Sequence, residues 1–248
     1  MFELSISTTS DKQHYICDIF DKLKKEVKSD GGVSLQFNYR GRSYFSIAVS
    51  DKKKEYYKSK ILEHIVFMII DDYKFGYYKQ NLSFTGQNII SQSFLKAISI
   101  FDSELDSDFI KRQVEFKGEI LIDSLFYFKL GALLEKWKKT AFVINQNQIL
   151  SSSESMIEVL KYLTMSSENY LVTANITICK KQIKFDSVLK NKSFKKDFDG
   201  CSDFLTEVVR LNPIKINLKT GDNGDSDKVV DLLSQIFTDK VYLINWDW

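Results

Sequence analysis

The sequence predicts an α+β protein, because strand-like and helix-like hydrophobic patterns occupy separate stretches of the chain. Apolar and polar residues alternate near both ends of the 248-residue chain, whereas the middle shows helical periodicity. The only proline is Pro213, so nothing before it forces a helix to end, although an AT-rich genome would lower the proline content equally well. We expect a long-helix central core flanked by an N-terminal βαββ unit and a C-terminal lobe ending in βαβ.

The βαββ unit is predicted over residues 1–50. Residues 2–6 alternate and indicate a strand, and the following apolar residues recur three and four apart, which indicates a helix. Ser10 is a candidate cap for this helix, and Gly31 and Gly32 are expected to end it. Two more alternating segments on either side of Gly41 predict a hairpin, formed by residues 33–39 and 43–50.

The rest of the chain is predicted to form helices first and mixed elements later. Four helices are expected at about residues 52–82, 86–102, 106–143 and 153–166, the last capped by Ser152 or Ser153. The C-terminal strands are expected at 171–178, 183–185, 214–218 and 241–244, and the helices between them at 201–211 and 226–237. The segments 1–50, 51–167 and 168–248 would then form three lobes or one compact domain.

The composition places the chain among cytoplasmic globular proteins. Apolar residues make up 44% and charged residues 27% of the sequence, and the formal net charge is +2. The longest apolar stretches, 61–70 and 120–134, are too short to span a bilayer, and the first ten residues do not resemble a signal peptide. Three widely spaced cysteines indicate neither a disulfide framework nor a zinc site.

Carboxylates and histidines give little sign of catalysis. Glu115, Glu119 and Asp123 are spaced by four and would share one helix face, either as an acid-base or metal site or as a solvated face. His64 is interpreted as a packed or half-buried residue. An enzyme would need distant residues such as Glu63, His64, Asp123 and Lys129 to converge. We therefore expect no metal and no cofactor, and we lean toward a non-enzyme.

Lysine clusters offer an alternative function, because lysines beside aromatic residues are typical of nucleic-acid surfaces. Acidic residues lie among most of these lysines, so solvated faces are the competing interpretation. The lysines that would bind phosphates are Lys136, Lys138, Lys139, Lys180, Lys181, Lys195 and Lys196.

Two segments stand out as candidate partner-binding sites. Asp123 and Lys129 lie with Phe126 and Phe128 in an apolar stretch, where a charge is costly to bury unless it is paired. Alternatively, Lys129 extends along its aliphatic stem to the surface. At the other candidate site, Trp246 and Trp248 either fold back onto the body of the protein or anchor a partner.

Residues 123–137, with Phe126, Phe128 and Leu130, resemble the central helix motif of the YtxC-like sporulation protein family. Residues 212–244 resemble the closing strand, helix and strand of that family. The chain departs from the family pattern at Ser124, at Lys129 where an arginine is usual, and in its tail, which lacks the family's cysteines. The resemblance implies a sporulation-associated bacterial context and no particular reaction. Because no catalytic set is evident and Trp246 and Trp248 could anchor a partner, we expect a cytoplasmic protein-interaction module with an unknown protein partner.

Overall fold

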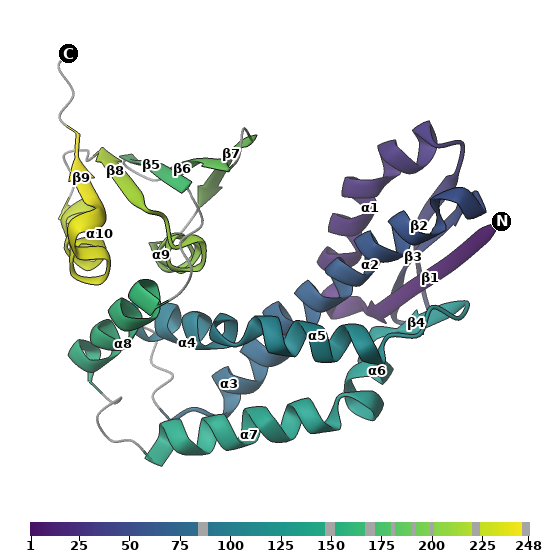
Figure 1. Ribbon diagram of the computed structural model, residues 1–248, viewed down its shortest axis with the longest axis horizontal. Coiled ribbons are helices and arrows are strands. Elements are labelled where there is room, and N and C mark those ends of the chain that lie inside the picture. Colours follow the sequence, from purple (N-terminus) through teal and green to yellow (C-terminus); the bar gives the residue numbers. More distant parts are fainter. Residues whose placement is uncertain are drawn as a thin grey trace. The chain divides into compact units, whose positions relative to one another are not determined.

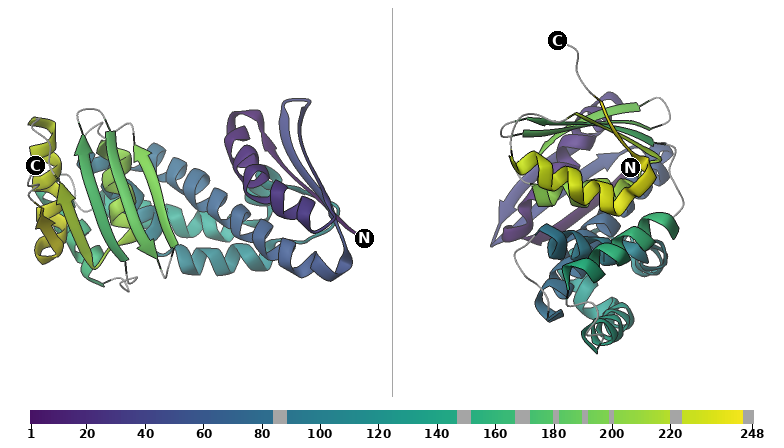
Figure 2. Two further views of the ribbon diagram at one scale, coloured as in Figure 1. Left: turned by 90° about the horizontal axis from the view of Figure 1, so that it is seen from above. Right: turned by 90° about the vertical axis from the view of Figure 1, so that its left-hand side faces the viewer.

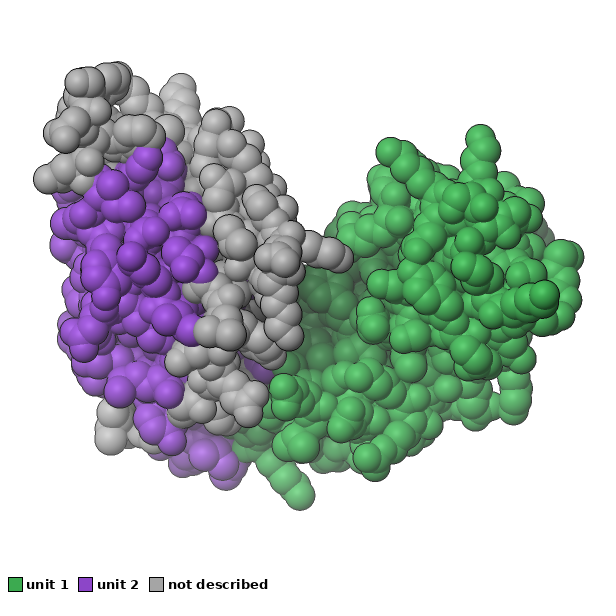
Figure 3. All heavy atoms as spheres, turned by 45° about the horizontal axis from the view of Figure 1, so that its top comes forward, with its two compact units in different colours: residues 1–77, 102–140 green, residues 78–101, 141–248 purple. Residues whose placement is uncertain are grey.

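The computed structural model confirms the α+β class, with two separate sheets and helices between them along the chain (Figure 1). It describes residues 1–83, 89–146, 152–166, 172–179, 182–189, 192–198, 201–219 and 224–244. The chain forms two compact units (Figure 3): unit 1 comprises residues 1–77 and 102–140, and unit 2 comprises residues 78–101 and 141–248. The segment 51–167 is therefore shared between the two units, and the chain passes between them three times.

The first sheet belongs to unit 1 and has the strand order β2-β3-β1-β4. The predicted βαββ unit is present as β1 (Phe2–Thr9), α1 (Gln13–Ser29), β2 (Val33–Tyr39) and β3 (Arg42–Val49). β3 pairs antiparallel with both β1 and β2, and the short strand β4 (Glu119–Leu121) adds in parallel to the other side of β1.

Helix α1 covers one face of this sheet (Figure 2), because its apolar residues recur at helical spacing while those of β1 and β3 alternate. Ile16 and Ile19 of the helix are buried together with Ile6 and Phe45 of the strands. Gly32 follows α1 where a Cβ would lie 2.7 Å from the carbonyl oxygen of Ala48, so this close approach requires glycine.

The expected helical cap at Ser10 is wrong. Residues Ser10–Lys12 form a 3-10 turn, and α1 begins after Lys12 without a side-chain cap. The cap at Ser152 is confirmed, because its hydroxyl accepts the backbone N–H of Ser155 at 3.2 Å at the start of α8 (Ser153–Ser166).

The expected long helix at 106–143 is also wrong, because the chain breaks there into α5 (Ser103–Gln113), β4, α6 (Ile122–Lys129) and α7 (Gly131–Gln146). β4 pairs with β1, a long-range contact that local periodicity does not report. Glu115 therefore lies in a loop, Glu119 in a strand and Asp123 in a helix, so these carboxylates do not share a helix face.

The expected helix at 52–82 is present as a continuous helical stretch with a wider turn inside it. It consists of α2 (Lys54–Met68), a π-helical segment (Ile69–Lys74) and α3 (Phe75–Asn81). π-helical turns are frequent at functional sites. Within the described residues, no helix is long and apolar enough to cross a membrane.

Unit 2 has three layers (Figure 2): a sheet, a middle layer of α9 and α10, and an outer layer of α4 and α8. The sheet order is β7-β6-β5-β8-β9, with β8 parallel to both β5 and β9. The expected closing βαβ crossover is thus confirmed. The elements of this unit are α4 (Ile89–Phe101), β5 (Val172–Cys179), β6 (Gln182–Leu189), β7 (Lys192–Phe198), α9 (Cys201–Leu211), β8 (Lys215–Lys219), α10 (Gly224–Phe237) and β9 (Val241–Leu243), with α8 as given above.

Strand β7 was not predicted from the sequence. Its sequence, KSFKKDF, has three lysines and one aspartate in seven residues, which hides the alternation expected of a half-buried strand. It is an edge strand, where charged residues are common.

Candidate functional site

The candidate binding residues of 123–129 lie on α6, between β4 and α7 (Figure 1). Asp123 is in the first turn of this helix, where the helix dipole favours an acid. Its carboxylate accepts hydrogen bonds from Arg42 at 2.8 Å, from Thr8 at 3.4 Å and from the hydroxyl of Tyr73. Asp123 is 14% exposed, so its charge is largely buried and paired.

The π-helical segment connects Asp123 to the rest of unit 1. Burial, together with the hydrogen bond to Asp123, raises the pKa of Tyr73, so the phenol stays protonated and donates. The ammonium of Lys12 lies 3.8 Å from the centre of the Tyr73 ring and 3.2 Å from the carboxylate of Asp72. Asp71 accepts the hydroxyl of Tyr15 at 3.1 Å. These contacts fix the position of α6 relative to α1 and β1.

Phe126 packs inward from α6 into an aromatic stack. Its ring centroid lies 4.5 Å from that of Tyr73 and 5.9 Å from that of Trp137, which is fully buried on α7. Phe126 is thus a core residue. Its ring contacts hold α6 in place, and the side chain is not available to a partner.

A buried ion cluster lies beside this stack. Lys74 and Asp106 are both fully buried, and their Nζ and Oδ2 atoms are 2.6 Å apart. Lys74 also contacts Asp102, and Lys136 binds Asp102 at 2.6 Å and Asp106 at 2.8 Å. The indole N–H of Trp137 donates to Asp106 at 3.0 Å. Burial would raise the pKa of Asp102, but hydrogen bonds from Lys136 and Lys74 outweigh burial and lower it.

Phe128 points away from the core and is 84% exposed. It lines a depression of about 350 Å³, whose apolar lining includes Leu121 and Leu125. Lys129 extends to the surface as anticipated, and its Nζ lies 2.7 Å from the carboxylate of Glu115. We call this area the α6 surface, and it consists of Glu115, Lys117, Leu121, Leu125, Phe128 and Lys129.

The charged residues of the α6 surface are paired with one another, and its one glutamate and two lysines leave a formal net charge of only +1. Glu115 accepts hydrogen bonds from Lys117 at 2.8 Å and from Lys129 at 2.7 Å. Hydrogen bonds from these two lysines lower the pKa of Glu115 to about 2 and hold it ionised. The apolar part of the surface is therefore flanked by paired charges rather than by a field of one sign.

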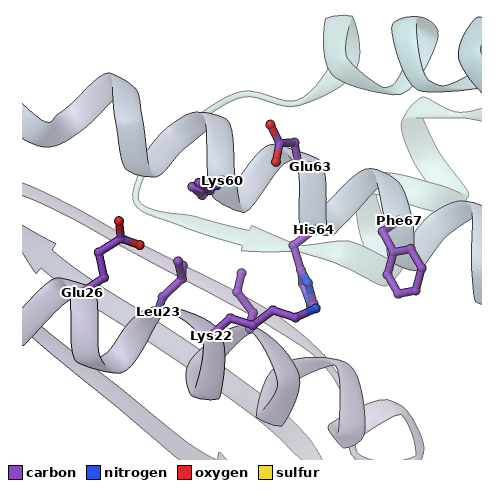
Figure 4. A pocket seen from close by; sticks show the side chains of 8 residues that line it. Lys22, Leu23, Glu26, Lys60, Glu63, His64 and Phe67 are labelled. Carbon is purple, nitrogen blue, oxygen red and sulfur yellow. The ribbon is translucent and has the colours of Figure 1, made fainter. Parts of the chain in front are cut away.

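A second depression, of about 390 Å³, lies between α1 and α2 (Figure 4). Ile19, Leu23 and Phe67 form its apolar part, and charged residues of both helices surround it. His64 is buried there, as expected, and one of its ring nitrogens lies 2.7 Å from the carbonyl oxygen of Tyr15. Burial lowers the pKa of His64 despite that hydrogen bond and the nearby Asp18 carboxylate.

The buried His64 makes stability depend on pH. Its folded-state pKa lies below the ordinary value of 6.5, so the unfolded chain binds more protons between these two values. The contribution of the neutral His64 to the free energy of unfolding is complete above about pH 6.5. It is lost as the pH falls toward the folded-state pKa. In urea unfolding, we expect the free energy of unfolding to fall between pH 7.5 and 5 by up to about 1.4 kcal/mol per pH unit.

The matched variants for this pH dependence are His64→Gln and His14→Gln. Glutamine keeps a donor for the Tyr15 carbonyl and does not titrate, so His64→Gln should flatten the curve relative to the wild type. His14 is the other histidine of the chain and is exposed, so His14→Gln is the matched control for the loss of an imidazole. Identical pH profiles for His64→Gln and the wild type would contradict this assignment.

The candidate nucleic-acid residues lie in several elements. Lys136 belongs to the buried ion cluster, Lys138 pairs with Glu135 at 2.5 Å, and Lys139 is exposed on α7. Lys195 and Lys196 are consecutive residues of β7. Lys180, Lys181, Trp246 and Trp248 lie outside the described residues, as do the side chains of Lys195 and Lys196.

Several residues of this site were missed by the sequence analysis: Arg42, Tyr73, Lys74, Asp102 and Asp106. Asp102 and Asp106 are spaced by four, and Lys74 lies four residues beyond the apolar stretch 61–70, but neither pattern identifies a partner on another helix. The hypothetical catalytic set is not assembled, because His64 contacts Tyr15 and Asp18 whereas Asp123 contacts other residues. The described residues hold no group of three or more His, Cys, Asp or Glu that fits a metal ion.

No protein-family model, curated protein or solved structure matches the chain. The resemblance of residues 123–137 and 212–244 to the YtxC-like family therefore stays a prediction.

Proposed function

We propose that the chain is a non-enzymatic protein-interaction module and that the α6 surface is its partner-binding site. One observation carries this proposal: the phenyl ring of Phe128 is 84% exposed beside an apolar depression. Burying an aromatic side chain of this size against a partner contributes about 1.5–3 kcal/mol. Large aromatic residues surrounded by polar groups are the usual anchors of protein interfaces.

The helix that carries Phe128 is held rigidly. Arg42 and Tyr73 bind Asp123 at its first turn, and Phe126 stacks between Tyr73 and Trp137. A partner that binds Phe128 therefore does not have to order α6, which lowers the entropic cost of association. In this proposal, Asp123 and Phe126 are positioning residues and Phe128 is the anchor.

The chemistry of the α6 surface indicates a partner that offers an apolar pocket. Glu115 lies between Lys117 and Lys129, so the surface presents no strong charge of one sign. Binding at this surface should depend weakly on salt. Binding of nucleic acid through the lysines at 136–139, 180–181 and 195–196, here called the Lys-rich segments, would instead fall steeply with salt. The affinity would drop by about one logarithmic unit per phosphate contact for each tenfold rise in salt concentration.

The sporulation context of the proposal depends on the family resemblance of residues 123–137 and 212–244. It indicates a partner that is present in spore-forming cells, so cells before and during sporulation are the natural source for a capture experiment.

The test compares affinity capture by the wild type, Phe128→Ser and Phe142→Ser. Phe142 is 64% exposed on α7 and is the matched control, because Phe142→Ser also removes an exposed phenyl ring, but outside the α6 surface. We expect Phe128→Ser to recover at least about tenfold less of a specific partner than the other two baits. Each lysate is divided into nuclease-treated and untreated halves.

Equal recovery of partners by all three baits would exclude the α6 surface as the binding site. Partners that disappear after nuclease treatment would favour the alternative, in which the Lys-rich segments bind nucleic acid. Purified partner then gives the dissociation constant for wild type and variants at two salt concentrations.

A further inference from the structure

Edge strand β2 exposes its apolar residues on the face of the sheet that α1 does not cover, where polar residues would be expected. Val33, Leu35, Phe37 and Tyr39 are 45–58% exposed, and their ladder partners Ala48, Ser46, Tyr44 and Arg42 lie on the same face. The polar residues of β2 take the opposite face, the one covered by α1. There the side-chain amide of Gln36 lies 3.0 Å from the sulfur of Cys17, which belongs to α1.

The orientation of β2 is fixed by its hairpin turn. Arg40 and Gly41 both have positive φ, 46° and 74°, as in the two-residue turn that matches the twist of a hairpin. Pairing with β3 is one-to-one from Val33 to Tyr39, without a bulge. A shift by one residue would reverse both faces of the strand, so the exposed apolar row follows from the specified register.

This edge also lacks the features that usually prevent strands from associating. The seven residues of β2, VSLQFNY, include no charged residue and no proline. The long edge strand of the other sheet, β7, has four charged residues in the same length. The remaining edges, β4 and β9, are three residues each. Among the described strands, β2 alone is a long, uncharged edge.

We propose that β2 pairs with β2 of a second copy of this chain, antiparallel about a two-fold axis at Gln36. Val33 of each copy then lies opposite Tyr39 of the other, and Leu35 lies opposite Phe37. The two four-stranded sheets become one continuous sheet, and the two apolar rows join on its open face. This inference concerns a different edge of the sheet from β4 and the α6 surface, so it does not depend on the proposed function.

A second copy is favoured over an unrelated strand because β2 is complementary to itself. In this register, apolar residues face apolar residues and polar residues face polar residues at every position. No charges meet across the axis, and both strands have the same length. The stack of Phe37 on Tyr44, with ring centroids 4.9 Å apart, keeps the aromatic part of the row rigid.

Sedimentation equilibrium of the full chain at micromolar concentrations tests the pairing. We expect a dimer, with twice the 28.9 kDa mass of the chain. The variant Leu35→Lys/Phe37→Lys places lysines opposite lysines across the axis, and Leu35→Glu/Phe37→Glu does the same with glutamates. Each variant alone should dimerise at least about 100-fold more weakly than the wild type. An equimolar mixture of the two should restore the dimer.

Circular dichroism and thermal unfolding establish that each variant is folded, and Phe142→Lys is the control for a charge placed on another exposed ring. Should the charged variants not fold, Leu35→Thr/Phe37→Thr keeps strand propensity and should weaken the dimer about tenfold. A monomeric wild type at tens of micromolar overturns the proposal. So does a dimer that the lysine variant leaves intact, or a mixture that stays monomeric.

Discussion

Replacement of Asp106 by alanine is expected to lower the free energy of unfolding by about 3–5 kcal/mol. Asp106 is fully buried and accepts hydrogen bonds from Lys74, Lys136 and Trp137. Without Asp106, the positive charges of Lys74 and Lys136 are balanced by Asp102 alone. The indole N–H of Trp137 also loses its hydrogen-bond acceptor. Urea unfolding followed by circular dichroism gives the free energy directly.

The control for this variant is Asp108→Ala on the same helix. Asp108 is exposed, so its replacement should change the free energy of unfolding by no more than about 0.5 kcal/mol. A second comparison uses Lys74→Met/Asp106→Leu, which removes one buried charge of each sign and should recover much of the loss. Equal stability of Asp106→Ala and Asp108→Ala would show that the buried cluster is unimportant.

Replacement of Trp137 by alanine is expected to cost about 3–5 kcal/mol, because it removes the largest fully buried side chain of the described residues. The cavity would lie beside Phe126 and remove one side of the aromatic stack that holds α6. Trp137→Phe keeps an aromatic ring and loses the hydrogen bond to Asp106, so it should cost clearly less.

The same two variants separate stability from binding. Because Phe126 positions the helix of Phe128, Trp137→Ala should also weaken partner capture under conditions where the protein stays folded. Trp137→Phe should leave capture close to that of the wild type. If Trp137→Ala unfolds at the same urea concentration as Trp137→Phe, the stack does not support α6.

The elements with regular local patterns were predictable from the sequence, and those that depend on distant partners were not. The alternation of β1 and β3, the helical spacing of α1 and the closing βαβ are all local signals. β4 is three residues long and forms because it pairs with β1. Its own sequence carries no clear strand pattern, so the local periodicity predicted one helix over residues 106–143. The charges of β7 likewise concealed a strand that its neighbour β6 specifies.

The candidate site shows the same division. A charge within an apolar stretch correctly drew attention to Asp123, since such a charge requires a partner. The partner, Arg42, is 81 residues away in sequence and belongs to a hairpin, and no spacing rule connects the two. The exposure of Phe128 was equally hidden, because Phe126 and Phe128 have the same chemistry and differ only in the side of α6 that they occupy.

The discontinuity of both units has a consequence for synthesis on the ribosome. Unit 1 is complete once residue 140 has emerged, whereas unit 2 needs residues close to the end of the chain. During that interval, α4 has been made, but α8 and α9, against which it packs, have not. Phe94 and Leu95 of α4 are buried in the finished protein, and they stay exposed until α8 and α9 have been made. All residues of unit 1, including its ion cluster, are present by then. If unit 1 folds during this interval, the nascent chain consists of a folded unit 1 and a helix α4 whose apolar residues are still exposed, and chaperones or aggregation would act at that stage.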